Sequence, residues 1–330
     1  ELTTSIGYND NAFRTDGGNV ADGFLRVSPS TTIRSIDTEY TFRNNIQATV
    51  GRHFTVSENN FLDFGAGSLF RTELVPNLDV AGIARFRRGH ENRASLEAAG
   101  EQGDLPKFLE PRAGVGLTYN LPDGFVSFEH QTSHKKFTSG ATSISSGLNS
   151  TTYDFSGCVG TTFSNHLGGL IIGDFTYTDR PNGAGRGAND NRTIAVLGTL
   201  AYQFSDVTDL RIGVGWLGSR PLTDQADRRQ TIIARGTMLW RPTTLTRVVA
   251  GIRTEANQTN LGDSGTSLLR EHTIRVAHDA HPAFDLLLEG RLTTEDVSGT
   301  ETRADTAEVI LGATYKLTDE IVLDARYTRE

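Results

Sequence analysis

The chain has 330 residues, a formal net charge of −8 and one cysteine, Cys158. A single cysteine excludes an intramolecular disulfide framework, and the acidic balance with scattered Lys and Arg argues against nucleic-acid binding. No window approaches the ~20 continuous apolar residues of a transmembrane helix, but a membrane β-strand needs only every second residue to be apolar.

Apolar and polar residues alternate along nearly the whole chain, which predicts β-strands with one apolar and one polar face. In 40–50, for example, Tyr40 and Ile46 lie on the face opposite to Arg43 and Gln47. The predicted strands are 2–9, 23–36, 40–54, 61–74, 78–89, 108–121, 125–137, 151–163, 169–180, 192–204, 210–220, 230–241, 245–256, 267–279, 284–295, 306–317 and 321–329.

The connections between these strands alternate strictly in length. The short ones are 37–39, 75–77, 122–124, 164–168, 205–209, 242–244, 280–283 and 318–320. The long ones are about 10–22, 55–60, 90–107, 138–150, 181–191, 221–229, 257–266 and 296–305. Outer-membrane barrels have this pattern because their periplasmic ends are tight turns and their extracellular ends are longer loops. We therefore predict an all-β fold, a transmembrane antiparallel up-and-down β-barrel that forms a single domain over 1–330 in the bacterial outer membrane.

The apolar strand faces carry aromatic residues near their ends, such as Tyr119, Tyr202 and Trp240, and smaller residues in the middle. This distribution predicts interfacial aromatic girdles on the lipid side of the barrel. The alternative is the ordinary preference of aromatic residues for strands.

The predicted strand number, seventeen, is odd. Bacterial single-chain barrels have an even number of strands, and an open edge in lipid leaves backbone groups unpaired at several kcal/mol each. We therefore expect about eighteen strands, the last of them missing from this chain. The alternative is a barrel of about sixteen, if 2–9 is not a strand.

Helical periodicity is limited to about 93–101, which predicts a short helical turn inside the loop 90–107. This charged loop and the Ser-, Thr- and Gly-rich loop 138–150 are the candidates for a gate or constriction of the lumen.

The polar strand faces are rich in charge and are predicted to line the lumen, where a barrel of about 16–18 strands encloses water. The candidate lumen-lining residues are Arg43, Arg71, Arg85, Arg112, Arg235, Arg253, Arg275, Arg291, Arg326, Asp63, Asp79, Glu129, Asp174, Asp285, Glu289, Glu308 and Asp324. One interpretation is a polar track that hydrogen-bonds the hydroxyls or uronates of a saccharide. The other is that opposite charges on neighbouring strands simply pair across the wall.

No pattern in the sequence predicts catalysis, a cofactor or a metal site. His130 and His134 are four residues apart on a predicted strand, so they lie about 13 Å from each other and do not form a zinc pair. The glycine-rich stretch 183–187 lies in a long loop without the strand–helix context of a phosphate-binding motif. We expect that the protein is not an enzyme and has no cofactor.

Four short stretches resemble the outer-membrane β-barrel porins found in proteobacterial exopolysaccharide gene clusters. They are Tyr-Asn-Asp-Asn-Ala-Phe-Arg at 8–14, Phe-Leu-Arg-Val-Ser-Pro at 24–29, Trp-Arg-Pro-Thr-Thr-Leu-Thr at 240–246 and Ala-Thr-Tyr-Lys-Leu-Thr-Asp at 313–319. The resemblance implies a barrel through which polysaccharide crosses the outer membrane. It also implies one more strand after the equivalent of 321–329, and it supplies no catalytic residues.

These observations leave three hypotheses for function. The first is a non-catalytic translocation barrel for exopolysaccharide or a similar hydrated polymer, surrounded by outer-membrane lipid and lipopolysaccharide and supplied by a periplasmic export partner. The second is a general diffusion porin for small solutes. The third is a structural barrel that anchors an extracellular or multiprotein assembly.

Overall fold

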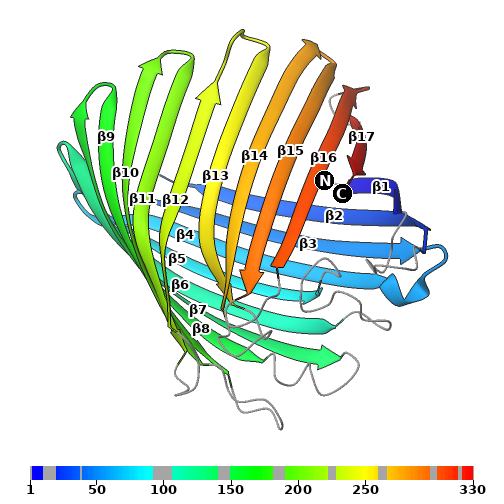
Figure 1. Ribbon diagram of the computed structural model, residues 1–330, viewed down its shortest axis with the longest axis horizontal. Helices are drawn as coiled ribbons and strands as arrows, with labels where there is room; N and C mark the ends of the chain where they lie inside the picture. The colour runs from blue at the N-terminus through cyan, green and yellow to red at the C-terminus, as the bar shows by residue number, and fades with distance from the viewer. Residues whose placement is uncertain are drawn as a thin grey trace.

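The computed structural model describes residues 2–9, 20–37, 39–91, 106–139, 149–180, 190–221, 228–258, 266–297, 303–318 and 322–329. These residues form one strongly curved antiparallel sheet (Figure 1). No helix among them is long and apolar enough to span a bilayer. The helical turn expected at 93–101 lies outside the described residues, as does most of the two loops considered as gates.

Seventeen strands are present among the described residues, with bounds close to those expected from alternation. They are β1 (Leu2–Asn9), β2 (Asp22–Ile36), β3 (Tyr40–His53), β4 (Phe61–Val75), β5 (Leu78–His90), β6 (Lys107–Leu121), β7 (Gly124–Ser139), β8 (Ser150–Ser164), β9 (Leu167–Asp179), β10 (Asn191–Ser205), β11 (Thr208–Pro221), β12 (Arg229–Trp240), β13 (Thr246–Gln258), β14 (Thr266–His281), β15 (Phe284–Val297), β16 (Arg303–Lys316) and β17 (Val322–Arg329). A 3-10 turn, Ser57–Asn59, lies between β3 and β4.

Each strand pairs antiparallel with the next one in the chain, from β1–β2 to β16–β17, which confirms the up-and-down topology. The described residues form no register between β1 and β17, so the sheet is open along one line, where both chain ends lie (Figure 1). Because the strand number is odd, β1 and β17 run in the same direction. The expected eighteenth strand stays a prediction.

The short connections are made by residues suited to tight turns. Asn77, between β4 and β5, has a φ of 69°, a left-handed conformation that Asn tolerates better than most residues. Its backbone N–H donates to Glu73 Oε1 at 2.7 Å. Between β6 and β7, Asp123 precedes Gly124, and the Asp123 carbonyl accepts a hydrogen bond from the backbone of Thr162 on β8 at 2.8 Å. We call this side of the sheet the turn end and the opposite side the loop end.

Strand register separates an inward from an outward face. Thr49 lies opposite Asp63, and Gly67 opposite Arg85, on the inward face. The outward face carries apolar side chains that stay exposed in the isolated chain, such as Ile171 at 62% and Ile232 at 75%. Exposure of a continuous apolar surface on the convex side is what a lipid-facing barrel requires.

Aromatic side chains gather on the outward face near the turn end. Tyr40, Tyr119, Phe163, Tyr202, Phe204, Trp240 and Tyr315 are all exposed there. Such residues are enriched where a membrane meets water, because their rings are apolar and several carry a polar group. The pattern fits one of the two interfacial girdles of a membrane barrel.

One part of the barrel departs from a simple polar lumen. Ala195, Leu197, Leu217 and Ile233 form a buried apolar cluster on the inward faces of β10–β12, and Ala256 of β13 packs against it. We call this cluster the apolar patch.

The apolar patch is covered because two neighbouring strands separate. β12 pairs with β13 only over Arg235–Trp240, so their loop-end halves part. The loop ends of β13–β15 lie against the inward face of β12, where Arg229 Nη1 donates to the Asp296 carbonyl of β15 at 3.2 Å. The lumen therefore contains a buried apolar region that alternation does not predict.

Candidate functional site in the lumen

The strands bring the predicted lumen-lining residues onto the inward face, where the register aligns them in rows. The residues whose side chains are described are Arg43, Arg71, Arg85, Arg112, Arg235, Arg253, Arg275, Arg291, Asp63, Asp79, Glu129, Asp174, Asp285, Glu289 and Glu308. Asp324 and Arg326 belong to β17, but their side chains lie outside the described part. Whether the whole set acts as a binding site stays a prediction.

On the wall formed by β13–β16, acidic groups pair with Arg253 and Arg291. Arg291 contacts Glu289 at 2.8 Å, Glu308 at 3.1 Å and Glu271 at 3.8 Å. Arg253 lies 3.7 Å from the same Glu271. These partly exposed pairs fit the second interpretation of the sequence, in which opposite charges pair across neighbouring strands.

The wall formed by β2–β5 is different, because it is hollowed into a recess of about 870 Å³. We call this feature the arginine recess. Its inward-facing lining consists of Arg26, Ser28, Arg43, Asn45, Gln47, Thr49, Phe61, Asp63, Gly65, Gly67, Leu69, Ile83, Arg85, Arg87 and His90. Gly65 and Gly67 leave room there, since a Cβ atom on Gly67 would come no nearer than 3.4 Å to Arg85 Cγ.

Four arginines of the recess, Arg26, Arg43, Arg85 and Arg87, form no ion pair with a described residue. Arg43 lies opposite Leu69 of β4 and Arg85 opposite Gly67 of β4, and the recess lining nearby includes Asn45 and Gln47. The Arg26 guanidinium lies between two rings, 5.6 Å from the centroid of Phe24 and 5.7 Å from that of Phe61.

Arg87 has an acidic neighbour that is engaged elsewhere. Its register partner is Glu110 of β6, but the Glu110 carboxylate contacts Arg112 at 3.0 Å. The Arg87 guanidinium instead lies 5.1 Å from the ring centroid of Phe108. The recess is therefore an electropositive surface beside amide and hydroxyl groups.

The one carboxylate among the described lining residues of the recess is also engaged. Asp63 Oδ1 lies 2.8 Å from His90 Nδ1, and the His90 ring is 4.1 Å from the ring of Phe61. Guanidinium groups bind carboxylates and phosphates through two parallel hydrogen bonds, whereas amides and hydroxyls suit neutral hydroxyl groups. The arrangement can bind an anionic, hydroxyl-rich solute, and its described lining contains no nucleophile with an adjacent base.

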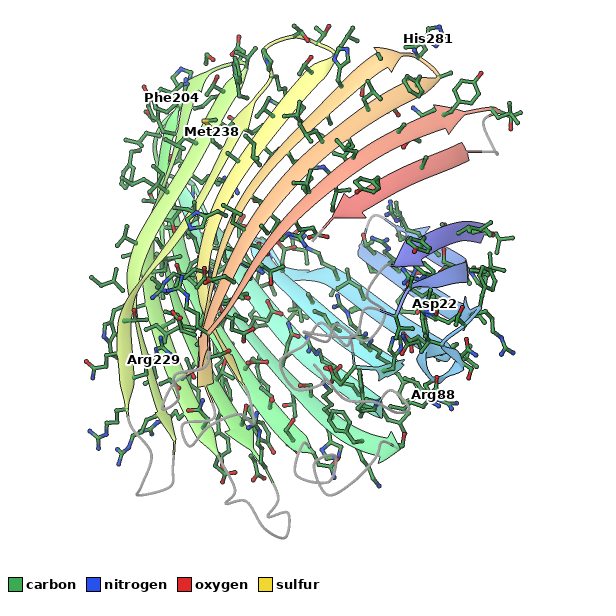
Figure 2. The ribbon with its side chains drawn as sticks, turned by 45° about the vertical axis from the view of Figure 1, so that its right-hand side comes forward. Asp22, Arg88, Phe204, Arg229, Met238 and His281 are labelled. Atoms are coloured by element: carbon green, nitrogen blue, oxygen red, sulfur yellow. The ribbon has the colours of Figure 1, made fainter. Side chains whose placement is uncertain are left out.

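A network of hydrogen bonds around Asp22 lies at the loop end of the recess. Asp22 has a fully buried side chain, whose carboxylate accepts hydrogen bonds from the backbone of Thr55 at 2.9 Å and Val56 at 3.3 Å and lies 2.8 Å from His53 Nδ1. The backbone N–H of His53 in turn donates to Asn60 Oδ1 at 2.7 Å. These bonds hold the β3–β4 connection against the start of β2 (Asp22 is labelled in Figure 2).

Sequence reasoning missed the aromatic part of this site. Phe24 and Phe61 face inward, although the sequence pattern predicts aromatic residues on the lipid side. The signal is present in the chain, because Phe24 shares its strand parity with Arg26 and Phe61 shares that of Asp63.

The histidines give no metal site in the described part of the chain. His130 and His134 lie on β7, as expected from the alternation there. No group of three or more side chains that could hold a metal ion occurs among the described residues.

A continuous run of antiparallel strands with an apolar outward face and a charged inward face defines a transmembrane β-barrel of the bacterial outer membrane. The chain belongs to the family described as "Putative beta-barrel porin 2", whose model matches residues 1–330. The resemblance to a porin family is thereby confirmed, while the link to exopolysaccharide stays a prediction.

Solved outer-membrane receptors have a similar fold. The FrpB iron transporter from Neisseria meningitidis (F5-1 variant) gives a TM-score of 0.59 at 9% identity, covering 99% of this chain and 62% of that one. The ferric enterobactin receptor mutant from Pseudomonas aeruginosa, in complex with enterobactin, gives 0.55 at 10% identity, covering 100% and 63%. The chain thus spans less than two thirds of their length, and the likeness concerns the fold alone. A search of curated proteins gave no match.

Proposed function

We propose that this outer-membrane channel passes an acidic exopolysaccharide, or a similar hydrated anionic polymer, without catalysis. The observation that carries the proposal is the arginine recess, in which Arg43, Arg85 and Arg87 form no ion pair with a described carboxylate. Cross-strand register also places Arg85 directly opposite Arg112, and Glu110 balances only one of these two charges. Like charges in this arrangement are unfavourable unless an anion or water screens them. A uronate-bearing chain would supply that anion.

The polymer would bind reversibly at several weak contacts. Guanidinium groups pair with uronate carboxylates, and Asn45 and Gln47 hydrogen-bond sugar hydroxyls. Transport requires binding that is strong enough for entry and weak enough for release. Solvated arginines on an open wall meet this requirement better than a buried pocket. A periplasmic export partner would deliver the polymer.

Single-channel conductance in planar bilayers tests the proposal. Oligogalacturonate added to one side should interrupt the current, and a neutral maltooligosaccharide of the same length should do so at least about tenfold more weakly. In the variant Arg43→Ala/Arg85→Ala, the concentration needed for half-block by oligogalacturonate should rise about tenfold or more.

The matched control is Arg71→Ala, which removes an inward arginine of the same wall that is already paired with Asp79 at 3.0 Å. It should leave the block unchanged. Equal block by both sugars in every variant would favour the general diffusion porin instead. A protein without any conductance would favour the third hypothesis, a structural barrel.

A further inference from the structure

The outward face has exposed basic side chains at one end only, among the described residues. By strand register, five Arg and Lys residues lie at the loop ends of β3, β5, β7, β10 and β11 and face outward, each with no ion pair to a described residue. They are Arg52, Arg88, Lys136, Arg192 and Arg220. We call these five residues the basic loop rim, and Arg88 is labelled in Figure 2.

The first part of the rim is a row across β9–β11. Arg192 lies directly opposite Arg220 on one side and Tyr177 on the other. The Cα atoms of directly opposite residues are about 5 Å apart. Two like charges at this spacing destabilise the sheet unless a counter-ion lies between them. The row therefore presents two guanidinium groups and a phenol to one anion.

The second part is a row across β4–β7 on the same outward face. Arg88 lies opposite Leu109, and Leu109 lies opposite Lys136, so the two cations flank one leucine. Phe64 lies on the other side of Arg88. Each cation is thus placed beside an apolar surface, as expected for a residue at the border of a lipid phase.

Other charges at the loop end are either paired with each other or fewer than the rim cations. On β16, Arg303 is paired with Asp305 at 2.9 Å. Arg270 is paired with Asp296 at 2.8 Å, and both lie near Arg229, where the loop ends of β14 and β15 contact β12. Two carboxylates, Asp179 of β9 and Asp190 just before β10, lie near Tyr177 and so beside the row of β9–β11. Because the rim has five cations and these are two carboxylates, the basic loop rim as a whole remains net positive.

The turn end lacks such cations among the described outward side chains and has exposed aromatic residues instead. Along β10, Tyr202 lies ten positions after Arg192. At about 3.3 Å per residue and a tilt of about 40°, this corresponds to about 25 Å along the membrane normal, the height of the apolar band of a membrane barrel. The rim cations therefore lie where the apolar band ends on the outer side.

We propose that the basic loop rim binds the phosphate groups of lipopolysaccharide in the outer leaflet. Arginine forks bind phosphate through two hydrogen bonds, and the apolar side chains below the rim contact the acyl chains of the same molecule. Each cation near a charged membrane surface contributes about 1 kcal/mol, about a fivefold change in affinity. The inference concerns the outer wall and is independent of the solute that passes through the lumen.

The experiment compares Arg192→Ala/Arg220→Ala with the parent protein in phosphatidylcholine vesicles. Binding of lipopolysaccharide is measured from the rise in unfolding temperature as its fraction in the vesicles increases, because a ligand that binds only the folded state stabilises it. The parent should be stabilised by lipopolysaccharide but not by the same lipid after chemical removal of its phosphates. The double variant should bind about 30-fold more weakly.

The matched control is Arg211→Ala/Arg247→Ala, which removes two exposed arginines from the inward face of β11 and β13. It should bind lipopolysaccharide like the parent. Arg88→Ala/Lys136→Ala tests the rim independently on the other side of the barrel, in case the first variant does not fold.

Two outcomes would overturn the proposal. One is that both rim variants, correctly folded by circular dichroism, are stabilised by lipopolysaccharide as much as the parent. The other is that inorganic phosphate alone reproduces the stabilisation, which would make the rim a site for free anions rather than for lipid. Neither outcome affects the conductance block by oligogalacturonate, so the two proposals fail separately.

Discussion

Asp22 is a carboxylate without solvent contact at the loop end of β2. Its oxygens satisfy the backbone N–H groups of Thr55 and Val56, which belong to no strand and have no ladder partner. Buried donors of this kind are costly when they lose their acceptor. At the scale of single residues, the stability of the loop end therefore depends more on this buried group than on the exposed ion pairs.

We predict that Asp22→Ala lowers the free energy of unfolding by about 3 kcal/mol, because two backbone N–H groups and His53 lose their acceptor. Urea unfolding in detergent micelles, followed by tryptophan fluorescence, measures this loss. Asp79→Ala is the control, since its partner Arg71 is well exposed and the pair contributes less than about 1 kcal/mol. Equal losses for the two variants would contradict the special role of Asp22.

A second residue prediction concerns the arginine recess. A side chain at position 65 would have free space, because a Cβ atom on Gly65 would have the Phe86 carbonyl oxygen as its nearest heavy atom, at 3.9 Å. Gly65→Phe should therefore fold and place a ring in the recess, which reduces the single-channel conductance measurably. Gly82→Phe is the control, because Gly82 faces outward with similar space. Its conductance should equal that of the parent.

At the scale of elements, the two edge strands differ from all others in their hydrogen bonds. β1 pairs only with β2, and β17 only with β16, among the described residues. We predict that backbone amides of β1 and β17 exchange hydrogen at least about tenfold faster than those of β6, β7, β14 and β15. Hydrogen exchange read by mass spectrometry checks this, and uniform protection across the sheet would contradict an open edge.

The strands themselves could be predicted because alternation is a local signal. The expected strand 230–241 is observed as Arg229–Trp240, and 284–295 as Phe284–Val297. Loop-length parity likewise predicts the up-and-down topology, since it follows from the two sides of a membrane. Strand parity alone then predicts that the charged residues face inward, without information about which strands are neighbours.

The apolar patch and the arginine recess could not be predicted in the same way, because they depend on how far each pair of strands stays in register. Alternation in β12 and β13 does not predict that their ladder stops at Arg235. A partial signal does exist in the continuous apolar runs 194–197 and 232–234, which are apolar on both faces. Such runs are typical of strands buried on both sides.

At the scale of the whole molecule, the two tryptophans report how the barrel lies in lipid. Trp216 is on the outward face near the loop end, and Trp240 is outward at the turn end, both about half exposed in the isolated chain. We predict that brominated lipids quench the fluorescence of the single-tryptophan variants Trp216→Phe and Trp240→Phe alike. Acrylamide in the aqueous phase should quench them weakly; strong quenching by acrylamide alone would place these faces in water.

The shared direction of β1 and β17 has a consequence for any polypeptide segment that fills the space between them. A single inserted segment running from the extracellular to the periplasmic side would be antiparallel to both neighbours at once, whereas the reverse orientation would be parallel to both. Two inserted strands that are antiparallel to each other would pair antiparallel with only one of the two edge strands, β1 or β17. A segment that closes the sheet with antiparallel pairing on both sides must therefore supply an odd number of strands in the correct direction. A segment of sufficient length with an even number of strands would not do so.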